Sequence, residues 1–166
     1  MVKLRKVYEN EADTAMDIIN AAKEYLKSQG IDQWQTGYPD LECIKEDIKN
    51  ERGFFVTDND EILGYLCVDY NGEPAYNNLK GEWKTDEKYV VVHRLAFYDK
   101  ARDKGISSMV FPLVEKMSRE KNIHSFRIDT DADNLKMKHI LKKNGFTYRG
   151  IIMYDGAEKI AFDKVF

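Results

Sequence analysis

The run YVVVHRLAF, at residues 89–97, is the feature that most constrains the fold. Its residues are apolar on both alternating faces, which is typical of a strand buried on both sides of a sheet. The loop YDKARDKG follows, and from Gly105 onward apolar side chains recur at helical spacing. The sequence therefore predicts a central strand, a loop and a helix in direct succession.

The remaining segments predict further strands and helices in a mixed arrangement. We expect a strand at residues 2–8, a helix capped by Asn10 that ends before Gly30, and a shorter helix capped by Asp40. Residues 53–70 read as a β-hairpin, and 123–130 as a strand. A helix with Asp133 as its N-cap and Gly145 beyond its end precedes two final strands joined at Asp155–Gly156. These patterns predict an α+β (mixed α/β) fold.

Composition favours one globular domain. The chain has 166 residues, of which 43% are hydrophobic and 33% charged. A net charge of −3 argues against a protein that coats nucleic acid or an anionic membrane. Neither a secretory signal nor a membrane span is recognisable, and the two cysteines, Cys43 and Cys67, have no metal-binding spacing. We expect a cytoplasmic protein with reduced thiols.

The loop after residue 97 predicts an anion site. The first N–H groups of the helix, at residues 105–108, attract anions, and Arg102 and Lys104 add positive charge beside them. Gly105 lets a ligand approach the backbone closely. Neither G-x-x-x-x-G-K-[ST] nor G-x-G-x-x-G is present. A phosphate or pyrophosphate would fit, and the alternative is an ordinary turn with solvated basic side chains.

Two motifs here resemble those of the GNAT N-acetyltransferases, in particular the small bacterial type. The segment LAFYDKARDKGIS resembles the acetyl-CoA signature R/Q-x-x-G-x-G/A, with Arg102 and Gly105 matching and Ser107 standing where the family prefers Gly or Ala. Downstream, Asn134, Met137, Gly145 and Phe146 are similar to the family pattern N-x-x-A…G-F. The order of elements also matches, so the resemblance covers essentially the whole chain.

The resemblance implies one acetyltransferase domain over residues 1–166, with a central, mixed, mostly antiparallel sheet of about seven strands and about four helices on both faces. It implies acetyl-CoA as cosubstrate, with Leu95, Ala96 and Phe97 along the pantetheine arm. It also implies a splay between the strand that ends near Phe97 and the strand at residues 123–129, into which the thioester enters. Asn134 and Met137 would touch the cofactor from the next helix. The pyrophosphate would be held by Arg102, Asp103, Lys104, Gly105, Ile106, Ser107 and Ser108.

Acetyl transfer to an amine needs a base, an oxyanion donor and a proton for the departing thiolate. By family analogy the strand amide near Phe97 is the oxyanion donor. His93 is the candidate base, because imidazole titrates near neutral pH; the alternative is a hydrogen-bonded core histidine. Arg94 should point to the opposite face, toward a buried partner such as a carboxylate.

The proton donor is less clearly indicated. Many family members place a tyrosine where this chain has Leu141, which leaves Tyr98, Tyr148, Tyr154 or solvent. The segment DTDAD at residues 129–133 lacks the glycine and glutamate of a calcium loop, so we expect no metal, and we place Asp129 near the substrate.

The family builds its acceptor pocket from the link between its first two helices and from nearby loops. Here these positions hold Trp34, Gln35, Tyr38, Tyr76 and Trp83, whose rings would suit an apolar amine or a cation; alternatively the tryptophans plug the core edge. We expect transfer of acetyl from acetyl-CoA to a primary amine by direct attack, on a small molecule or a protein, and a homodimer, as is common in the family. The rival interpretations are a CoA-binding module with little turnover and an interaction protein whose basic loop meets an acidic partner.

Overall fold

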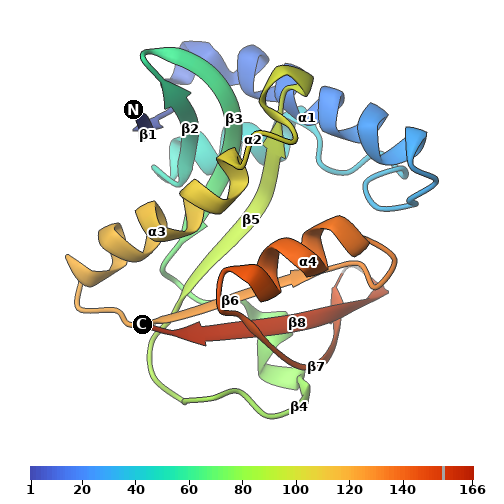
Figure 1. Cartoon of the computed structure of the whole chain (residues 1–166), viewed down its shortest axis with the longest axis vertical. Coiled ribbons are helices and arrows are strands. Elements are labelled where there is room, and N and C mark those ends of the chain that lie inside the picture. The colour runs from blue at the N-terminus through green and yellow to red at the C-terminus, as the bar shows by residue number, and fades with distance from the viewer. Residues whose placement is uncertain (155) are drawn as a thin grey trace. The chain divides into compact units, whose positions relative to one another are not determined.

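The chain forms both strands and helices along its length, as Figure 1 shows for the computed structural model, which describes residues 1–154 and 156–166. Three short 3-10 turns, at Glu9–Glu11, Pro74–Asn78 and Asp99–Ala101, lie between the longer elements. In chain order the strands and α-helices are β1 (Val2–Lys6), α1 (Ala12–Ser28), α2 (Leu41–Lys49), β2 (Gly53–Asp58), β3 (Glu61–Asp69), β4 (Lys80–Gly81), β5 (Val90–Phe97), α3 (Ile106–Arg119), β6 (Ser125–Thr130), α4 (Leu135–Lys143), β7 (Thr147–Tyr154) and β8 (Ala157–Val165).

The strands are ordered β1-β2-β3-β5-β6-β8-β7-β4 by their hydrogen bonds. β5 and β6 pair in parallel, at Val90 with Phe126 and Val91 with Arg127. The β1–β2, β2–β3, β6–β8, β7–β8 and β4–β7 pairs are antiparallel. The predicted mixed, mostly antiparallel fold is thus confirmed. The described strands number eight rather than about seven, because the segment between β3 and β5 contributes the two-residue β4.

The chain forms two compact units, each described here by itself. Unit 1 comprises residues 1–68 and 93–113, and unit 2 comprises residues 69–92 and 114–166. The chain passes from one unit to the other three times, within β3, within β5 and within α3. The expectation of a single domain over residues 1–166 stays a prediction.

The core of unit 1 joins α1 and α2 to its strands. Ala15, Ile18 and Ile19 of α1 are fully buried, because residues three and four apart share one helix face. They pack in one cluster with Ile44 of α2 and Phe55 of β2. The expected cap at Asn10 is wrong, since α1 begins at Ala12 after the turn at Glu9–Glu11.

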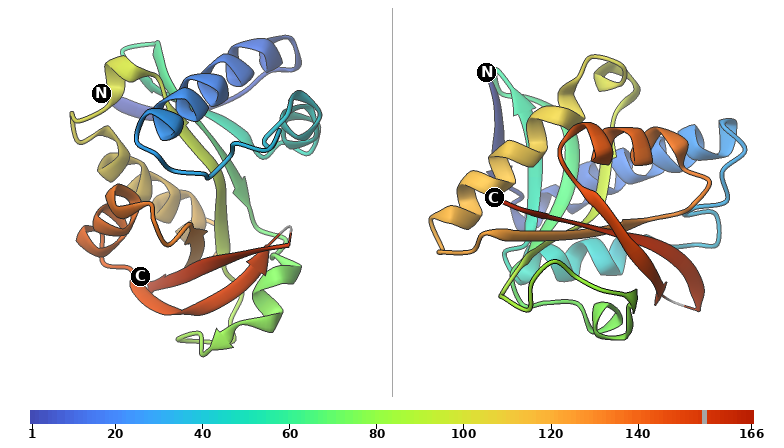
Figure 2. Two further views of the ribbon diagram at one scale, coloured as in Figure 1. Left: turned by 90° about the vertical axis from the view of Figure 1, so that its right-hand side faces the viewer. Right: turned by 60° about the horizontal axis from the view of Figure 1, so that its bottom comes forward.

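Unit 2 is built on the long β7–β8 pair, which Figure 2 shows as two adjoining arrows. Phe126 of β6 meets Phe146, which directly precedes β7, edge to face with ring centroids 4.9 Å apart. Tyr76, Val91, Ile152 and Ala161 form a buried cluster. The register of β7 shifts between Tyr148 and Gly150.

Both ends of α4 show local capping. The expected N-cap at Asp133 is wrong by one residue: the side chain of Asn134 accepts the Met137 N–H at 3.1 Å. Gly145 follows the helix with a φ of +87°, a conformation that glycine adopts without strain, as predicted. In the turn expected between the last two strands, Asp155 lies outside the described residues.

Candidate active site

The two edges of β5 in unit 1 carry different backbone groups. The Tyr98 N–H donates to the Leu63 carbonyl at 2.9 Å, and a Cβ on Gly64 of β3 would lie 2.7 Å from the Ala96 carbonyl oxygen. Ala96 and Tyr98 therefore face β3. Because successive residues of a strand direct their N–H and C=O groups to opposite edges, Leu95 and Phe97 direct theirs away from β3.

Arg102 is fastened inside the loop that follows β5. Its Nη2 donates to the Phe97 carbonyl at 2.7 Å, its Nη1 pairs with Asp99, and its guanidinium lies 4.2 Å from the ring centroid of Tyr25. Burial lowers the pKa of Arg102, and its side chain is only 11% exposed. Arg102, which was predicted to bind the pyrophosphate, therefore has a structural role: its contacts shape the backbone around residues 103–105.

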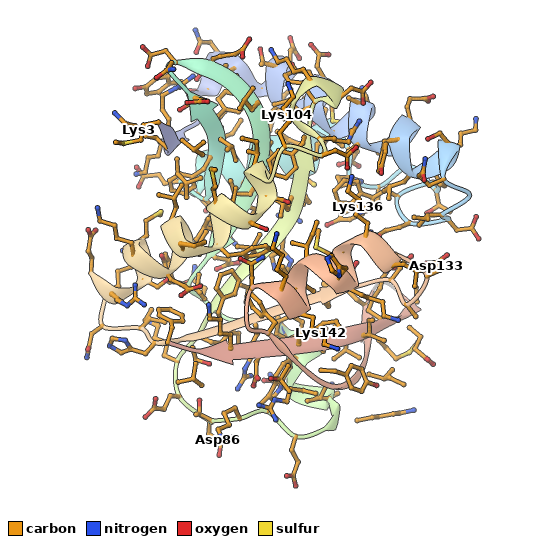
Figure 3. The ribbon with its side chains drawn as sticks, viewed as in Figure 1. Lys3, Asp86, Lys104, Asp133, Lys136 and Lys142 are labelled. Carbon is orange, nitrogen blue, oxygen red and sulfur yellow. The ribbon has the colours of Figure 1, made fainter. Side chains whose placement is uncertain are left out.

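The turn into α3 leaves open space where an anion was expected. Gly105 has a φ of +73°, and nothing lies within 4 Å of the position that a Cβ would occupy. Lys104 is exposed in this turn (Figure 3), Asp103 is exposed as well, and Ser107 and Ser108 lie half-buried in the first turn of α3 above the buried Ile106. A backbone approachable at glycine, beside a helix start and a lysine, fits a pyrophosphate.

Arg94 is the irregular residue of β5. Its φ is +56°, which costs a non-glycine residue roughly 1–2 kcal/mol. Two parallel bonds join its guanidinium to Asp47, from Nη2 to Oδ1 at 2.5 Å and from Nε to Oδ2 at 2.8 Å. The predicted buried carboxylate partner is confirmed, and its source is α2.

Two tyrosines complete the group around this ion pair. The Tyr65 hydroxyl donates to Asp47 Oδ2 at 2.7 Å, and Arg94 Nη1 donates to the Tyr38 hydroxyl at 2.7 Å. Burial alone would lower the pKa of Arg94, but the hydrogen bond to Asp47 raises it, so the guanidinium stays charged. Burial and Asp47 raise the pKa of Tyr65, which therefore keeps the proton it donates.

His93 precedes Arg94 and is half-buried. Because Arg94 departs from the extended conformation, β5 does not continue as a regular strand between His93 and Leu95, and strict alternation no longer fixes their faces. The role of His93 as base stays a prediction.

The predicted acceptor residues fall into both units. In unit 1, Trp34 packs against the core cluster of α1 and α2, and Tyr38 is bound to Arg94. In unit 2, the Trp83 Nε1 donates to the Tyr76 carbonyl at 3.0 Å, and their rings lie 5.3 Å apart. Each tryptophan is thus anchored at the margin of a core cluster.

Asp129 of β6 is held by Tyr76. The fully buried Tyr76 donates its hydroxyl to Asp129 Oδ2 at 2.7 Å. Burial raises the pKa of Asp129 to about 6, although the Tyr76 hydrogen bond and Lys159 both lower it. Lys159 itself forms an ion pair with Asp131. Asp129 is therefore a carboxylate that exchanges its proton near neutral pH.

The candidate proton donors lie in distinct surroundings. Tyr98 packs at the core of unit 1, and burial raises its pKa. In unit 2, Tyr154 packs against the cluster of Tyr76, whereas Tyr148 is 52% exposed. Tyr148 lines an open cavity of about 670 Å³ together with Lys138, Lys142, Phe146, Thr147, Ile160 and Phe162. Leu141, at the position of the family tyrosine, is fully buried.

Sequence reasoning missed three supporting residues. Asp47, 47 residues before Arg94 in the chain, binds its guanidinium, Tyr65 donates to Asp47, and Tyr25 of α1 stacks on Arg102. The one available signal was a buried arginine on β5, which requires a carboxylate but does not say where it comes from.

The described residues contain no group of three or more His, Cys, Asp or Glu side chains that could hold a metal ion. His124 and His139 are exposed. Within residues 1–154 and 156–166, the helices are too short or too polar to cross a membrane.

Comparisons with known proteins agree with this architecture. An acetyltransferase of the GNAT family from Streptococcus agalactiae is 29% identical, with a TM-score of 0.89 over 99% of this chain and 95% of that one. One from Listeria monocytogenes is 16% identical, with a TM-score of 0.79 over 99% and 95% of the two chains. The aminoglycoside acetyltransferase AAC(6')-Ib, solved with coenzyme A, is 18% identical, with a TM-score of 0.72 over 99% and 95%.

Sequence comparisons give the family directly. No curated protein sequence matches the chain significantly. The model of the acetyltransferase (GNAT) family matches residues 17–146, which include β5, the loop at Gly105 and the segment from Asn134 to Phe146. With its fold matching as well, the chain belongs to the GNAT acetyltransferase family.

Proposed function

We propose that this protein transfers the acetyl group of acetyl-CoA to a primary amine by direct nucleophilic attack. The observation that carries the proposal is the turn at Gly105, where a left-handed glycine opens the backbone beside the start of α3 and an exposed lysine. Solved structures of AAC(6')-Ib hold coenzyme A or acetyl-CoA, which supports the same cosubstrate here.

In this proposal unit 1 supplies the cofactor strand. The pyrophosphate binds the amides of residues 103–108, and the pantetheine arm runs along the edge of β5 that carries Leu95 and Phe97. As the amine nitrogen bonds to the thioester carbon, the carbonyl oxygen becomes an oxyanion, for which the Phe97 N–H is the donor. Collapse then breaks the C–S bond and releases the thiolate.

Two protons must move in this reaction. His93 takes the proton that the amine loses, and Tyr98, Tyr148, Tyr154 or solvent supplies one to the thiolate. Of the tyrosines, Tyr154 has the surroundings that favour it most, because it packs beside the Tyr76–Asp129 pair. Asn134 and Met137 are proposed cofactor contacts from α4.

The acceptor is proposed to be an amine with an apolar or cationic body, for which Trp34 and Tyr38 are the candidate contacts in unit 1, and Trp83 and Asp129 are those in unit 2. Structures of AAC(6')-Ib contain kanamycin or ribostamycin, so the fold accommodates polycationic amines. For this chain the proposed acceptor is the amine of a small molecule or of a protein. The proposed location of the protein is the cytoplasm.

The competing proposal is a CoA-binding module of the same fold with little turnover. It is favoured by the buried Leu141, which removes the usual acid. Thermal unfolding with CoA and thiol release from acetyl-CoA with a panel of amines separate the two. Stabilisation together with amine-dependent thiol release supports the enzyme; stabilisation without thiol release supports the module; and no stabilisation overturns both.

A further inference from the structure

We propose that Asp47 and Arg94 are positioning residues that hold the left-handed residue of β5 and fasten residues 34–38, the acceptor loop, to the cofactor strand. The inference rests on the proposed acetyl transfer. It adds that one buried ion pair positions both the cofactor strand and the acceptor loop, although neither of its residues touches a substrate.

The backbone of Arg94 needs such support. A φ of +56° is unfavourable for arginine, and conformations of this kind persist only where the surrounding structure determines them. Here the side chain is only 11% exposed and is fixed at Nε, Nη1 and Nη2 by Asp47 and Tyr38. The guanidinium is planar, so three anchored nitrogens leave it one orientation.

Asp47 is itself well placed to impose that orientation. It lies in α2, its side chain is only 4% exposed, and both carboxylate oxygens are engaged by Arg94. The Tyr65 hydroxyl adds a third bond to Oδ2. A buried, fully bonded carboxylate on a helix is a rigid reference point for the strand.

The acceptor loop is tied to the same guanidinium. Tyr38 accepts the Arg94 Nη1 hydrogen bond at 2.7 Å, and beside it Lys23 donates to the Pro39 carbonyl at 2.5 Å. At the other end of the loop, Gln35 donates to the Lys23 carbonyl at 3.0 Å. A displacement of Tyr38 by a bound acceptor therefore acts on Arg94, and through it on the adjacent His93 and Leu95.

The test compares two variants that each remove one hydroxyl from this group. Tyr38→Phe loosens the acceptor loop from Arg94, whereas Tyr65→Phe removes a bond to Asp47 that does not involve the loop. We expect Tyr38→Phe to raise the acceptor KM about three- to tenfold, the loss typical of one hydrogen bond, with the CoA Kd within about twofold. Tyr65→Phe should lower the melting temperature and change the acceptor KM less than Tyr38→Phe does.

Equal effects of the two variants on the acceptor KM, or no effect of Tyr38→Phe, would overturn the proposal. A wild-type protein without acetyl transfer would instead refute the proposed function. In that case amide NMR spectra decide: Tyr38→Phe should shift the His93 and Leu95 resonances, and Tyr65→Phe should not.

The role of the ion pair is tested by the conformation of Arg94. In Asp47→Asn, three-bond HN–Hα coupling should show residue 94 moving from positive φ to an extended conformation, with kcat falling about tenfold or more, since small misplacements are costly. The double variant Asp47→Asn/Arg94→Gly has no buried charge left unpaired, and its glycine tolerates positive φ. It should keep the original conformation and recover part of kcat. An unchanged φ of residue 94 in Asp47→Asn contradicts the proposal.

Discussion

The Nη2 of Arg102 donates a 2.7 Å hydrogen bond to the carbonyl oxygen of Phe97, so the arginine of the loop is fastened to the last residue of the strand before it. The bond uses one backbone group on the edge of β5 that the pantetheine arm is proposed to follow. Arg102 thus shapes the backbone of the proposed cofactor site.

This arrangement predicts different roles for Arg102 and Lys104 in CoA binding. Arg102→Gln should weaken CoA binding at both low and high salt, because it releases the loop from Phe97 and Tyr25. Lys104→Gln should weaken binding about threefold at low salt and less at high salt, since exposed charges are screened beyond about 10 Å at 0.1 M. Calorimetric titration of CoA at two salt concentrations measures both. Loss of the Arg102→Gln effect at high salt would show that Arg102 acts mainly as a charge.

Gly105→Ala should abolish most CoA binding, because its Cβ occupies the open space proposed for the pyrophosphate. Gly30→Ala is a matched control: its φ is +71°, against +73° at Gly105, and neither Cβ meets an atom within 4 Å. Both variants should lose about 1 kcal/mol of unfolding free energy from the left-handed conformation. Only Gly105→Ala should lose affinity, and equal CoA affinities would refute the loop assignment.

Asn134 has a structural role that must be separated from its proposed contact with CoA. Asn134→Ala should lower the unfolding free energy by about 1 kcal/mol, because the cap on the Met137 N–H is lost. Asn134→Ser keeps a capping oxygen and should retain most of that stability. Both variants should weaken CoA binding in calorimetry if the amide touches the cofactor. A normal CoA affinity in Asn134→Ser would show that Asn134 only caps the helix.

Asp129 should make stability depend on pH. Its pKa is raised from 3.8 to about 6, so the folded protein holds this proton more tightly than the unfolded chain does, and the resulting stability is lost as the pH rises through about 6. Asp129→Asn should therefore be more stable than wild type at pH 7.5, by up to about 3 kcal/mol, with the difference vanishing below about pH 4.

Chemical denaturation at the two pH values measures this effect, and Asp86→Asn, at an exposed site of unit 2, is the control (Figure 3). The groups around Asp129 are Tyr76, Lys159, Glu73 and Asp131. A stability difference that does not change with pH would show that the carboxylate is not desolvated as described.

Most elements follow from local patterns in the sequence. The period of α1, the apolar run of β5 and the glycine after α4 are all signals carried by neighbouring residues, and the structure confirms them. The predictions of Asn10 and Asp133 as N-caps are wrong, because several polar residues stand together at each helix start and local preference does not choose among them.

The candidate site was less predictable, because its support comes from distant residues. No sequence signal predicts the positive φ of Arg94. The conformation is imposed by Asp47 of α2, and the sequence around Asp47 does not predict that it contacts β5. Similarly, the basic character of Arg102 suggested an anion ligand, while Phe97 and Tyr25 determine where its charge lies. The open backbone at Gly105 could be predicted, since glycine after a strand and before a helix already indicated it.

The central claim is that acetyl passes from CoA to an amine. The most direct test incubates the protein with acetyl-CoA carrying an isotopic label in its acetyl group and a panel of primary amines, and follows the label by mass spectrometry. We predict that wild type forms a labelled amide on at least one amine, that Gly30→Ala does so too, and that Gly105→Ala does not. A wild-type protein that binds CoA yet transfers no label to any amine tested would contradict the account.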